Sequence, residues 1–315
     1  MSFLPGSPAG PGSPARMQDS PALARLKEVI GDLDRLVVAF SGGADSSLVA
    51  RVATDVLGAD RVLCATAVSD SLAGEELADC EALAAEWGLR WQAVRTSETS
   101  DAAYVANDTM RCYHCKSHLM DALAPIAHRE RAVVALGVNL DDLTDERPGQ
   151  VAAYERGARF PLVDAGLTKS EVRAVSSEMG LRTWDKPAAP CLASRIPYGT
   201  PVSITALGAV GRAEAALHRL GFREVRVRHY GTTARLELPL EDLPRALGVR
   251  EAIVGAVRDA GYQYVTLDLE GLRSGNLNRG ASCAPASDGT LSHVGAQLGS
   301  PSVMHLSGAP EEATR

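Results

Sequence analysis

The sequence predicts an α/β protein with a parallel β-sheet, followed by a smaller α+β domain. Over residues 22–185, short β-branched apolar runs alternate with segments of helical periodicity, the pattern of a parallel sheet covered by helices. Residues 186–200 are rich in Pro and irregular, which ends that alternation. Beyond them the order becomes helix, strand, strand, helix, strand over 201–278, with a hairpin turn at Tyr230-Gly-Thr-Thr233. These observations set the domain boundaries that we expect.

The first domain begins with a helix predicted by apolar periodicity over 23–33. The run Arg35-Leu-Val-Val-Ala-Phe40 is short, apolar and bounded by turn residues, as in a strand buried on both faces. A helix follows from near Asp45. The same patterns predict strands over 62–68, 91–96 and 132–138 and helices over 75–87 and 115–128. Thr168-Lys-Ser-Glu171 matches a capping box and starts a helix toward Gly180.

The second domain is expected to contain helices over 204–220 and 243–260 and strands over 224–229, 234–238 and 264–269. The junction at 186–200 carries Cys191. Ligand sites are frequent at domain junctions and at the carboxyl ends of parallel strands, so this junction is a candidate site.

Composition narrows the class of protein. The 315 residues carry a net charge of -7, unlike the basic domains that bind nucleic acid. No apolar run reaches the roughly 18–20 residues that span a bilayer, and the first residues lack a secretory signal, so we expect a cytoplasmic protein without a membrane partner. Residues 1–21, with five Pro, three Gly and four Ser, and residues 279–315 are predicted to be disordered tails.

The strongest local signal is the loop Ser41-Gly-Gly-Ala-Asp-Ser-Ser47 between a strand and a helix. Gly42 and Gly43 let backbone amides approach an anion, and Ser41, Ser46 and Ser47 can donate to phosphate oxygens. The loop lacks the Lys of a Walker A sequence. Asp45 would repel phosphate unless Mg²⁺ intervenes, so we assign Asp45 a magnesium-linked role.

The strand, the SGGxDS loop and the helix resemble the PP-loop ATP pyrophosphatases, whose fold is similar to the adenine nucleotide alpha hydrolases. The resemblance implies ATP as cosubstrate and attack at its α-phosphorus, with release of pyrophosphate and an adenylated intermediate. It also implies adenine contacts near Ala67 and Val68 on the second strand and near Gly137 after the fourth.

Three cysteines are candidates for chemistry. Cys112 and Cys115 have CxxC spacing, and Cys191 lies in the junction. A CxxC alone fits a zinc half-site, a redox pair or chance, and structural zinc normally needs four ligands. Three thiolates also suit a 4Fe–4S cluster with one open iron. Cys64 and Cys80 fall on a predicted strand and helix and are expected to be buried structural residues; Cys283 lies in the tail and is incidental.

Six motifs in order resemble the LarE family of ATP-dependent pyridinium-3,5-biscarboxylic acid mononucleotide sulfurtransferases, which act in nickel-pincer nucleotide biosynthesis. They are RCYHCK (111–116), GVNLDDLTDERPG (137–149), PLVDAGLTKSEVR (161–173), PCLASRIPYGTPVS (190–203), VRVRHYG (225–231) and YVTLDLEGLRSGNLN (264–278). The resemblance covers residues 23–278. It implies that a pyridinium carboxylate is adenylated and that sulfur then displaces AMP to give a thiocarboxylate.

The family resemblance also implies the role of Cys191, which matches the sulfur-donating position. Some members sacrifice that sulfur, and members with three cysteines use a cluster-bound sulfide. Because Cys112 and Cys115 are both present here, we predict a 4Fe–4S cluster held by Cys112, Cys115 and Cys191.

A mononucleotide substrate brings negative charge to an acidic chain, so a few cations must bind it. Arg226 and Arg228 alternate on one strand and therefore face the same side. The family resemblance implies that they and Lys116 contact the substrate phosphate, with a solvated basic strand edge as the alternative. It also implies that Glu214 and Glu237 lie near a metal or the active site, with ordinary surface carboxylates as the alternative. Candidate partners of pyrophosphate, adenylate or the ATP site are Lys169, Lys186, Arg195, Asp141, Asp142, Asp145 and Arg147.

Other functions remain open at this point. A tRNA-thiolating PP-loop enzyme also combines a CxxC with a distant Cys, although it predicts a basic RNA surface. An ammonia-using ligase of the NAD synthetase kind is a second alternative, but this function would assign no role to the three cysteines. A non-catalytic ATP-binding regulatory module is a different class altogether. The family resemblance further implies a homo-oligomer.

Overall fold

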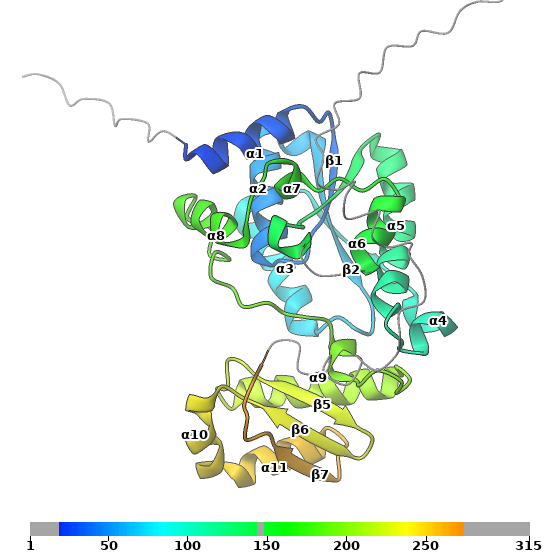
Figure 1. Cartoon of the computed structure of the whole chain (residues 1–315), viewed down its shortest axis with the longest axis vertical. Coiled ribbons are helices and arrows are strands. Elements are labelled where there is room, and N and C mark those ends of the chain that lie inside the picture. Colours follow the sequence, from blue (N-terminus) through cyan, green and yellow to red (C-terminus); the bar gives the residue numbers. More distant parts are fainter. Residues whose placement is uncertain (1–18, 144–147, 274–315) are drawn as a thin grey trace, which may run out of the picture.

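A computed structural model describes residues 19–143 and 148–273, and it contains two β-sheets (Figure 1). The first sheet has four strands, all parallel, in the order β3-β2-β1-β4. They are β1 (Leu36–Ala39), β2 (Val62–Val68), β3 (Trp91–Arg95) and β4 (Val133–Leu136). The predicted α/β fold with a parallel sheet is confirmed.

Helices cover both faces of this sheet (Figure 1). Successive side chains of β1 point to opposite faces: Leu36 and Val38 pack with one core cluster and Val37 with another. The helices of this half are α1 (Pro21–Gly31), α2 (Ala44–Leu57), α3 (Gly74–Trp87), α4 (Ala102–Val105), α5 (Arg111–Glu130), α6 (Pro148–Glu155), α7 (Pro161–Asp164) and α8 (Lys169–Glu178).

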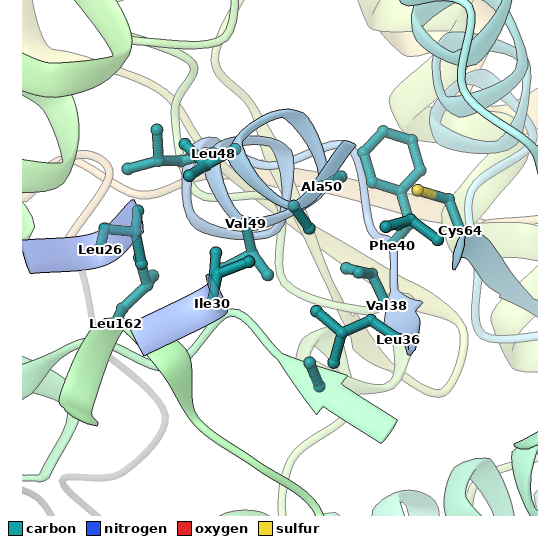
Figure 2. Close-up of a cluster of buried hydrophobic side chains, with 14 of the residues drawn as sticks. Leu26, Ile30, Leu36, Val38, Phe40, Leu48, Val49, Ala50, Cys64 and Leu162 are labelled. Atoms are coloured by element: carbon teal, nitrogen blue, oxygen red, sulfur yellow. The ribbon is translucent and has the colours of Figure 1, made fainter. Parts of the chain in front are cut away.

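The larger core cluster joins α1 and α2 to the sheet. Figure 2 shows Leu26 and Ile30 of α1 and Leu48 of α2 on the same side as Leu36 and Val38 of the sheet. Cys64 belongs to this cluster, and burial raises the pKa of its thiol to about 12, so it is a structural residue as predicted.

The second sheet lies in the C-terminal half, below the first in Figure 1. Its order is β5-β6-β7, with β5 and β6 antiparallel and β6 and β7 parallel. The elements are α9 (Ile204–Arg219), β5 (Arg226–Tyr230), β6 (Thr233–Glu237), α10 (Leu243–Gly248), α11 (Arg250–Asp259) and β7 (Tyr264–Leu267). A separate hydrophobic cluster holds the helices on this sheet, so the predicted smaller α+β part is present.

Three expectations about elements need correction. Helix α1 begins at Pro21 with Ser20 as its cap, so the end of the predicted tail 1–21 belongs to that helix. Helix α5 begins at Arg111 rather than Cys115, so the whole CxxC lies within it. The helix predicted over 243–260 is two helices, because residue Val249 has non-helical dihedral angles between α10 and α11.

Two further predictions concern the ends of the chain and the membrane. Most of the first predicted tail and all of the second, at 279–315, lie outside the described residues, as does Cys283. In the part of the chain that the structure describes, no helix has the length and apolar character needed to cross a bilayer.

Candidate active site

The phosphate loop lies where the winding of the sheet reverses. Strands β2 and β3 follow β1 toward one edge, and β4 lies on the other side of β1, so the carboxyl ends of β1 and β4 flank the reversal. Ligands of open α/β sheets bind at such a point. The loop joins β1 to the 14-residue helix α2, whose first turn can hold an anion. Ala67, at the partly exposed end of β2, lies at the same edge.

The loop has a fixed internal geometry. Gly42 has φ 66°, a conformation that favours glycine. The Ser46 hydroxyl accepts a hydrogen bond from the Ser41 amide at 3.2 Å and lies 3.0 Å from the Ser41 hydroxyl. Ser47 is fully buried. Gly43 caps α2 without a side chain, which leaves space for a ligand at the helix start.

Gly137 holds β4 against the loop. A Cβ atom at this position would lie 2.6 Å from the Ser46 amide nitrogen and 2.8 Å from the Asp45 carbonyl carbon. These are backbone atoms, which cannot rotate away from the added methyl group as a flexible side chain could. Close backbone approach therefore explains the glycine, and the adenine contact near Gly137 stays a prediction.

Gly137→Ala is expected to lower the free energy of unfolding by about 1–3 kcal/mol, because the added methyl group overpacks the backbone at residues 45–46. We also expect weaker ATP binding, since the loop must shift. Urea unfolding and calorimetric ATP titration measure the two effects. Gly255→Ala is the matched control, because Gly255 lies in α11 with nothing within 4 Å of the new methyl group. Equal stability of the two variants would contradict this role.

Asp45 is held by two side chains from distant parts of the chain. Its Oδ1 accepts a hydrogen bond from Asn139 Nδ2 at 3.0 Å, and its Oδ2 forms an ion pair with Lys169 Nζ. The first residue of α8 is therefore adjacent to the phosphate loop. Mg²⁺ in nucleotide sites uses one or two carboxylates, with phosphates and water as its other ligands, so the Asp45 carboxylate fits this ion once Lys169 moves aside.

Lys186 is a second cation at the loop. Its Nζ lies 3.8 Å from where a Cβ atom of Gly42 would stand, and it contacts Glu76 Oε2 at 2.9 Å and Asp79 Oδ2 at 2.7 Å. Burial alone would lower the pKa of Lys186, but the Asp79 and Glu76 carboxylates outweigh burial and the pKa is raised. The phosphate loop itself contains no lysine, but the fold places Lys169 and Lys186 beside it.

The acidic residues after β4 shape the loop that carries Asn139. Asp141 Oδ2 accepts a hydrogen bond from the Lys169 amide at 2.8 Å, and Asp142 Oδ2 accepts one from the Asn139 amide at 3.2 Å. Asp145 and Arg147 lie outside the described residues.

The CxxC pair lies in the first two turns of α5. Cys112 is exposed and Cys115 is half-buried. Burial, followed by the charge of Cys191, raises the pKa of Cys115 to about 12. Arg111, which precedes Cys112, donates a hydrogen bond to the Ala193 carbonyl at 2.9 Å, and this contact brings the backbone near Cys191 to the CxxC helix.

The three sulfurs do not converge on a single-ion site among the described residues. Among residues 19–143 and 148–273, no group of three or more His, Cys, Asp or Glu side chains is close enough together to hold a metal ion. Thiolates are suitable donors for iron, and those of a 4Fe–4S cluster bind separate irons and need not meet at one ion, so the cluster stays a prediction.

Cys191 is exposed and caps the short 3₁₀ helix Leu192–Arg195. We call residues 190–200 the Cys191 segment. The Leu192 amide donates to the Ser71 carbonyl at 2.9 Å, three residues beyond the end of β2. The segment is thereby attached to the same edge of the sheet as the phosphate loop.

Arg195, which lies within the Cys191 segment, attaches the segment to the C-terminal half of the chain. Its guanidinium forms two hydrogen bonds with the Glu214 carboxylate, at 2.9 and 3.0 Å, and donates to the Pro190 carbonyl at 2.7 Å. Glu214 also accepts a hydrogen bond from the Val227 amide at 2.8 Å. Glu214 thus lies beside the Cys191 segment, and both side chains are largely buried.

Arg226 and Arg228 face the same side of β5, as predicted from their spacing: their cross-strand partners are Glu237 and Arg235. Arg228 is buried, with Nη2 2.7 Å from Glu237 Oε2 and Nη1 donating to the Ser194 carbonyl at 2.9 Å. Arg226 is half-buried and donates to the Arg273 carbonyl at 3.1 Å. The two arginines therefore differ: Arg228 is committed to an internal ion pair.

Lys116 lies one helical turn after Cys112, and its Cβ faces Gly149 of α6. No hydrogen bond or ion pair to Lys116 is present among the described residues. No such contact joins it to Arg226 or Arg228 in that part of the chain either, so the proposed three-cation phosphate site stays a prediction.

The chain is similar to several known proteins. Residues 26–135 match the NAD synthase family model. An uncharacterised protein of Synechocystis sp. is 49% identical over 263 residues, covering 82% of this chain and 97% of the relative. The pyridinium-3,5-bisthiocarboxylic acid mononucleotide synthase of Lactiplantibacillus plantarum is 38% identical over 256 residues, covering 81% and 93% of the two chains. This chain belongs to the LarE family.

Several residues of this LarE-family site were missed by the sequence analysis. Asn139 meets the predicted Lys169 at Asp45, and Asn107 and Arg111 contact the Cys191 segment. Glu98 is buried, and its Oε1 accepts a hydrogen bond from the Ser71 hydroxyl at 3.2 Å. All except Glu98 and Asn107 lie within the quoted motifs, but a motif does not tell which of its members meet a distant residue.

Proposed function

We propose that this LarE-family chain is an ATP-dependent sulfurtransferase that converts a carboxylate of a pyridinium mononucleotide to a thiocarboxylate. The main support is the attachment of the Cys191 segment to the sheet edge that carries the phosphate loop, through the Leu192–Ser71 hydrogen bond of 2.9 Å. A phosphate-binding loop and an exposed thiol at one edge suit a reaction that uses ATP and sulfur in succession.

The first step is adenylation. The amides at the start of α2 and the cations Lys169 and Lys186 are suited to bind the ATP phosphates, and Asp45 to hold Mg²⁺, which when bound would neutralise phosphate charge. A substrate carboxylate oxygen attacks the α-phosphorus, and pyrophosphate leaves with the electron pair of the broken P–O bond. This step is needed because oxide is a poor leaving group, whereas AMP is a good one.

The second step is sulfur transfer. A sulfur nucleophile attacks the acyl carbon and AMP leaves. If the nucleophile is Cys191 itself, its Cβ–S bond then breaks with loss of the Cα proton, leaving dehydroalanine and the thiocarboxylate. If three thiolates hold a 4Fe–4S cluster, that cluster would supply a sulfide at its open iron. We retain the cluster as our proposal, with Cys191 as the sulfur source in the alternative.

Arg226 is the better candidate for the substrate phosphate. Its half-buried guanidinium makes one hydrogen bond, to a backbone carbonyl, among the interactions of the described residues, whereas Arg228 binds Glu237 and Ser194. A guanidinium can bind phosphate with two parallel hydrogen bonds. Arg228 then serves mainly to hold the Cys191 segment on the C-terminal sheet.

The test is a single-turnover assay of the anaerobically purified full chain with ATP and pyridinium-3,5-biscarboxylic acid mononucleotide. We expect pyrophosphate release that depends on the pyridinium substrate, and a product whose mass shows exchange of oxygen for sulfur. Iron and sulfide analysis together with the mass of Cys191 identifies the sulfur source. An iron-free protein that turns over once while Cys191 loses its sulfur would contradict the cluster.

The alternatives give different results in the same assay. A regulatory module releases no pyrophosphate, and an ammonia ligase of the NAD synthetase kind requires ammonia in place of sulfur. A tRNA-thiolating enzyme requires tRNA. The match to the NAD synthase family covers residues 26–135 and stops before Cys191, so it supports a common nucleotide-binding half rather than a common second substrate.

A further inference from the structure

Asn107 makes an unusual set of contacts with the Cys191 segment. It is fully buried, and its backbone has φ 55°, a left-handed conformation that Asn tolerates better than most residues. Its Nδ2 donates to the carbonyls of Pro197 at 2.8 Å and Thr200 at 2.7 Å, and its own carbonyl accepts from the Gly199 amide at 3.0 Å. One side chain thus fixes the end of the segment against the start of α5.

Arg111 continues this network toward the cysteines. Its Nη1 donates to Asn107 Oδ1 at 2.6 Å and to the Ala193 carbonyl at 2.9 Å, and its guanidinium lies 5.3 Å from the centre of the Tyr198 ring. Arg111 is 5% exposed, so these contacts are shielded from water. Because Arg111 directly precedes Cys112 and Ala193 is two residues after Cys191, this contact joins the backbones that carry the two thiols.

We infer that Asn107 and Arg111 are positioning residues that fix Cys191 relative to the CxxC helix. Their contacts are with backbone carbonyls, so they set the path of the segment whatever side chains it carries. The catalytic significance of this inference rests on the proposed sulfur transfer.

The geometry can be tested without activity. The reduced, metal-free full chain is treated with a short bis-maleimide, and mass spectrometry counts bridges from Cys191 to Cys112 or Cys115. The Cys112–Cys115 bridge lies within one helix and serves as an internal reference. We expect Asn107→Gly and Arg111→Lys to lower the Cys191 fraction roughly tenfold, since small misplacements of reacting groups have effects of about this size or larger.

The variants are chosen to separate positioning from unfolding. Asn107→Gly keeps a residue that tolerates φ 55°, and Arg111→Lys keeps the buried charge but lacks Nη1, the nitrogen that donates to both Asn107 and Ala193. Arg245→Gln is the matched control, because Arg245 also donates to two backbone carbonyls, at 2.6 and 3.0 Å, in the C-terminal half. If Asn107→Gly does not fold, Arg111→Lys decides the matter.

A bridge fraction within twofold of the parent in a folded Asn107→Gly or Arg111→Lys variant would overturn the inference. In single turnover we expect the same variants to slow sulfur transfer about tenfold and to keep pyrophosphate release, since only the sulfur geometry changes. If the parent chain makes no thiocarboxylate but the variants still lose bridges, the proposed function fails while the positioning role stands.

Discussion

Cys191→Ser is expected to abolish thiocarboxylate formation, with a loss on the order of 1000-fold or more, as when a nucleophile is removed. Pyrophosphate release should continue, because the phosphate loop, Asp45 and Lys169 are untouched. Mass spectrometry of the product and a pyrophosphate assay measure the two steps separately. Thiocarboxylate formed by Cys191→Ser at the parental rate would exclude Cys191 from the reaction.

Cys112→Ser is the informative companion of Cys191→Ser. If a cluster carries the sulfur, loss of one thiolate ligand should remove iron and abolish transfer as well. If Cys191 gives up its own sulfur, Cys112→Ser should retain a single turnover. Cys112 is exposed, so neither result is confused by a cavity in the core.

Arg228→Met is expected to lower the free energy of unfolding by about 3 kcal/mol, because it leaves the buried Glu237 carboxylate without the Arg228 guanidinium. Glu237 keeps a second contact, with Arg235 Nη2 at 3.0 Å, which limits the loss. Urea unfolding measures the change. Adding Glu237→Gln should recover part of it, since the buried carboxylate charge is then removed.

Arg226→Met is the matched comparison for Arg228→Met. It removes the neighbouring guanidinium on the same face, which among the described residues hydrogen-bonds to a backbone carbonyl, so we expect a loss of only about 1 kcal/mol. The KM for the pyridinium mononucleotide should rise instead. An unchanged KM for Arg226→Met would mean that the substrate phosphate binds at another site. Equal destabilisation by the two variants would contradict the structural difference between Arg226 and Arg228.

Local patterns predicted most of the elements. Strand β2 has the predicted bounds, because its apolar run ends at turn residues, and the capping box at Thr168 is present with both reciprocal hydrogen bonds. The start of α5 was predicted four residues late. Met110 caps it without a side-chain hydrogen bond, so the sequence there carries no cap signal.

The contacts of the site were less predictable than its elements. Asp45 and Lys169 are 124 residues apart, and Arg111 and Ala193 are 82 apart. Helical and strand periodicity report on neighbours along the chain, whereas these pairs depend on how β4, α8 and the junction pack around the sheet. The motifs identified the residues, and the fold determined their partners.

Besides the Arg195–Glu214 ion pair, the Cys191 segment is held largely through its backbone. The bonds to Ser71, Arg111, Asn107 and Arg228 all use its main-chain amides or carbonyls, and the Cys191 side chain is exposed. The side chain at position 191 can therefore be replaced without loss of the contacts that hold the segment in place. Selenocysteine or a spectroscopic label can take that place with the surrounding scaffold unaltered, so that changes in turnover report on the chemistry of the atom placed there.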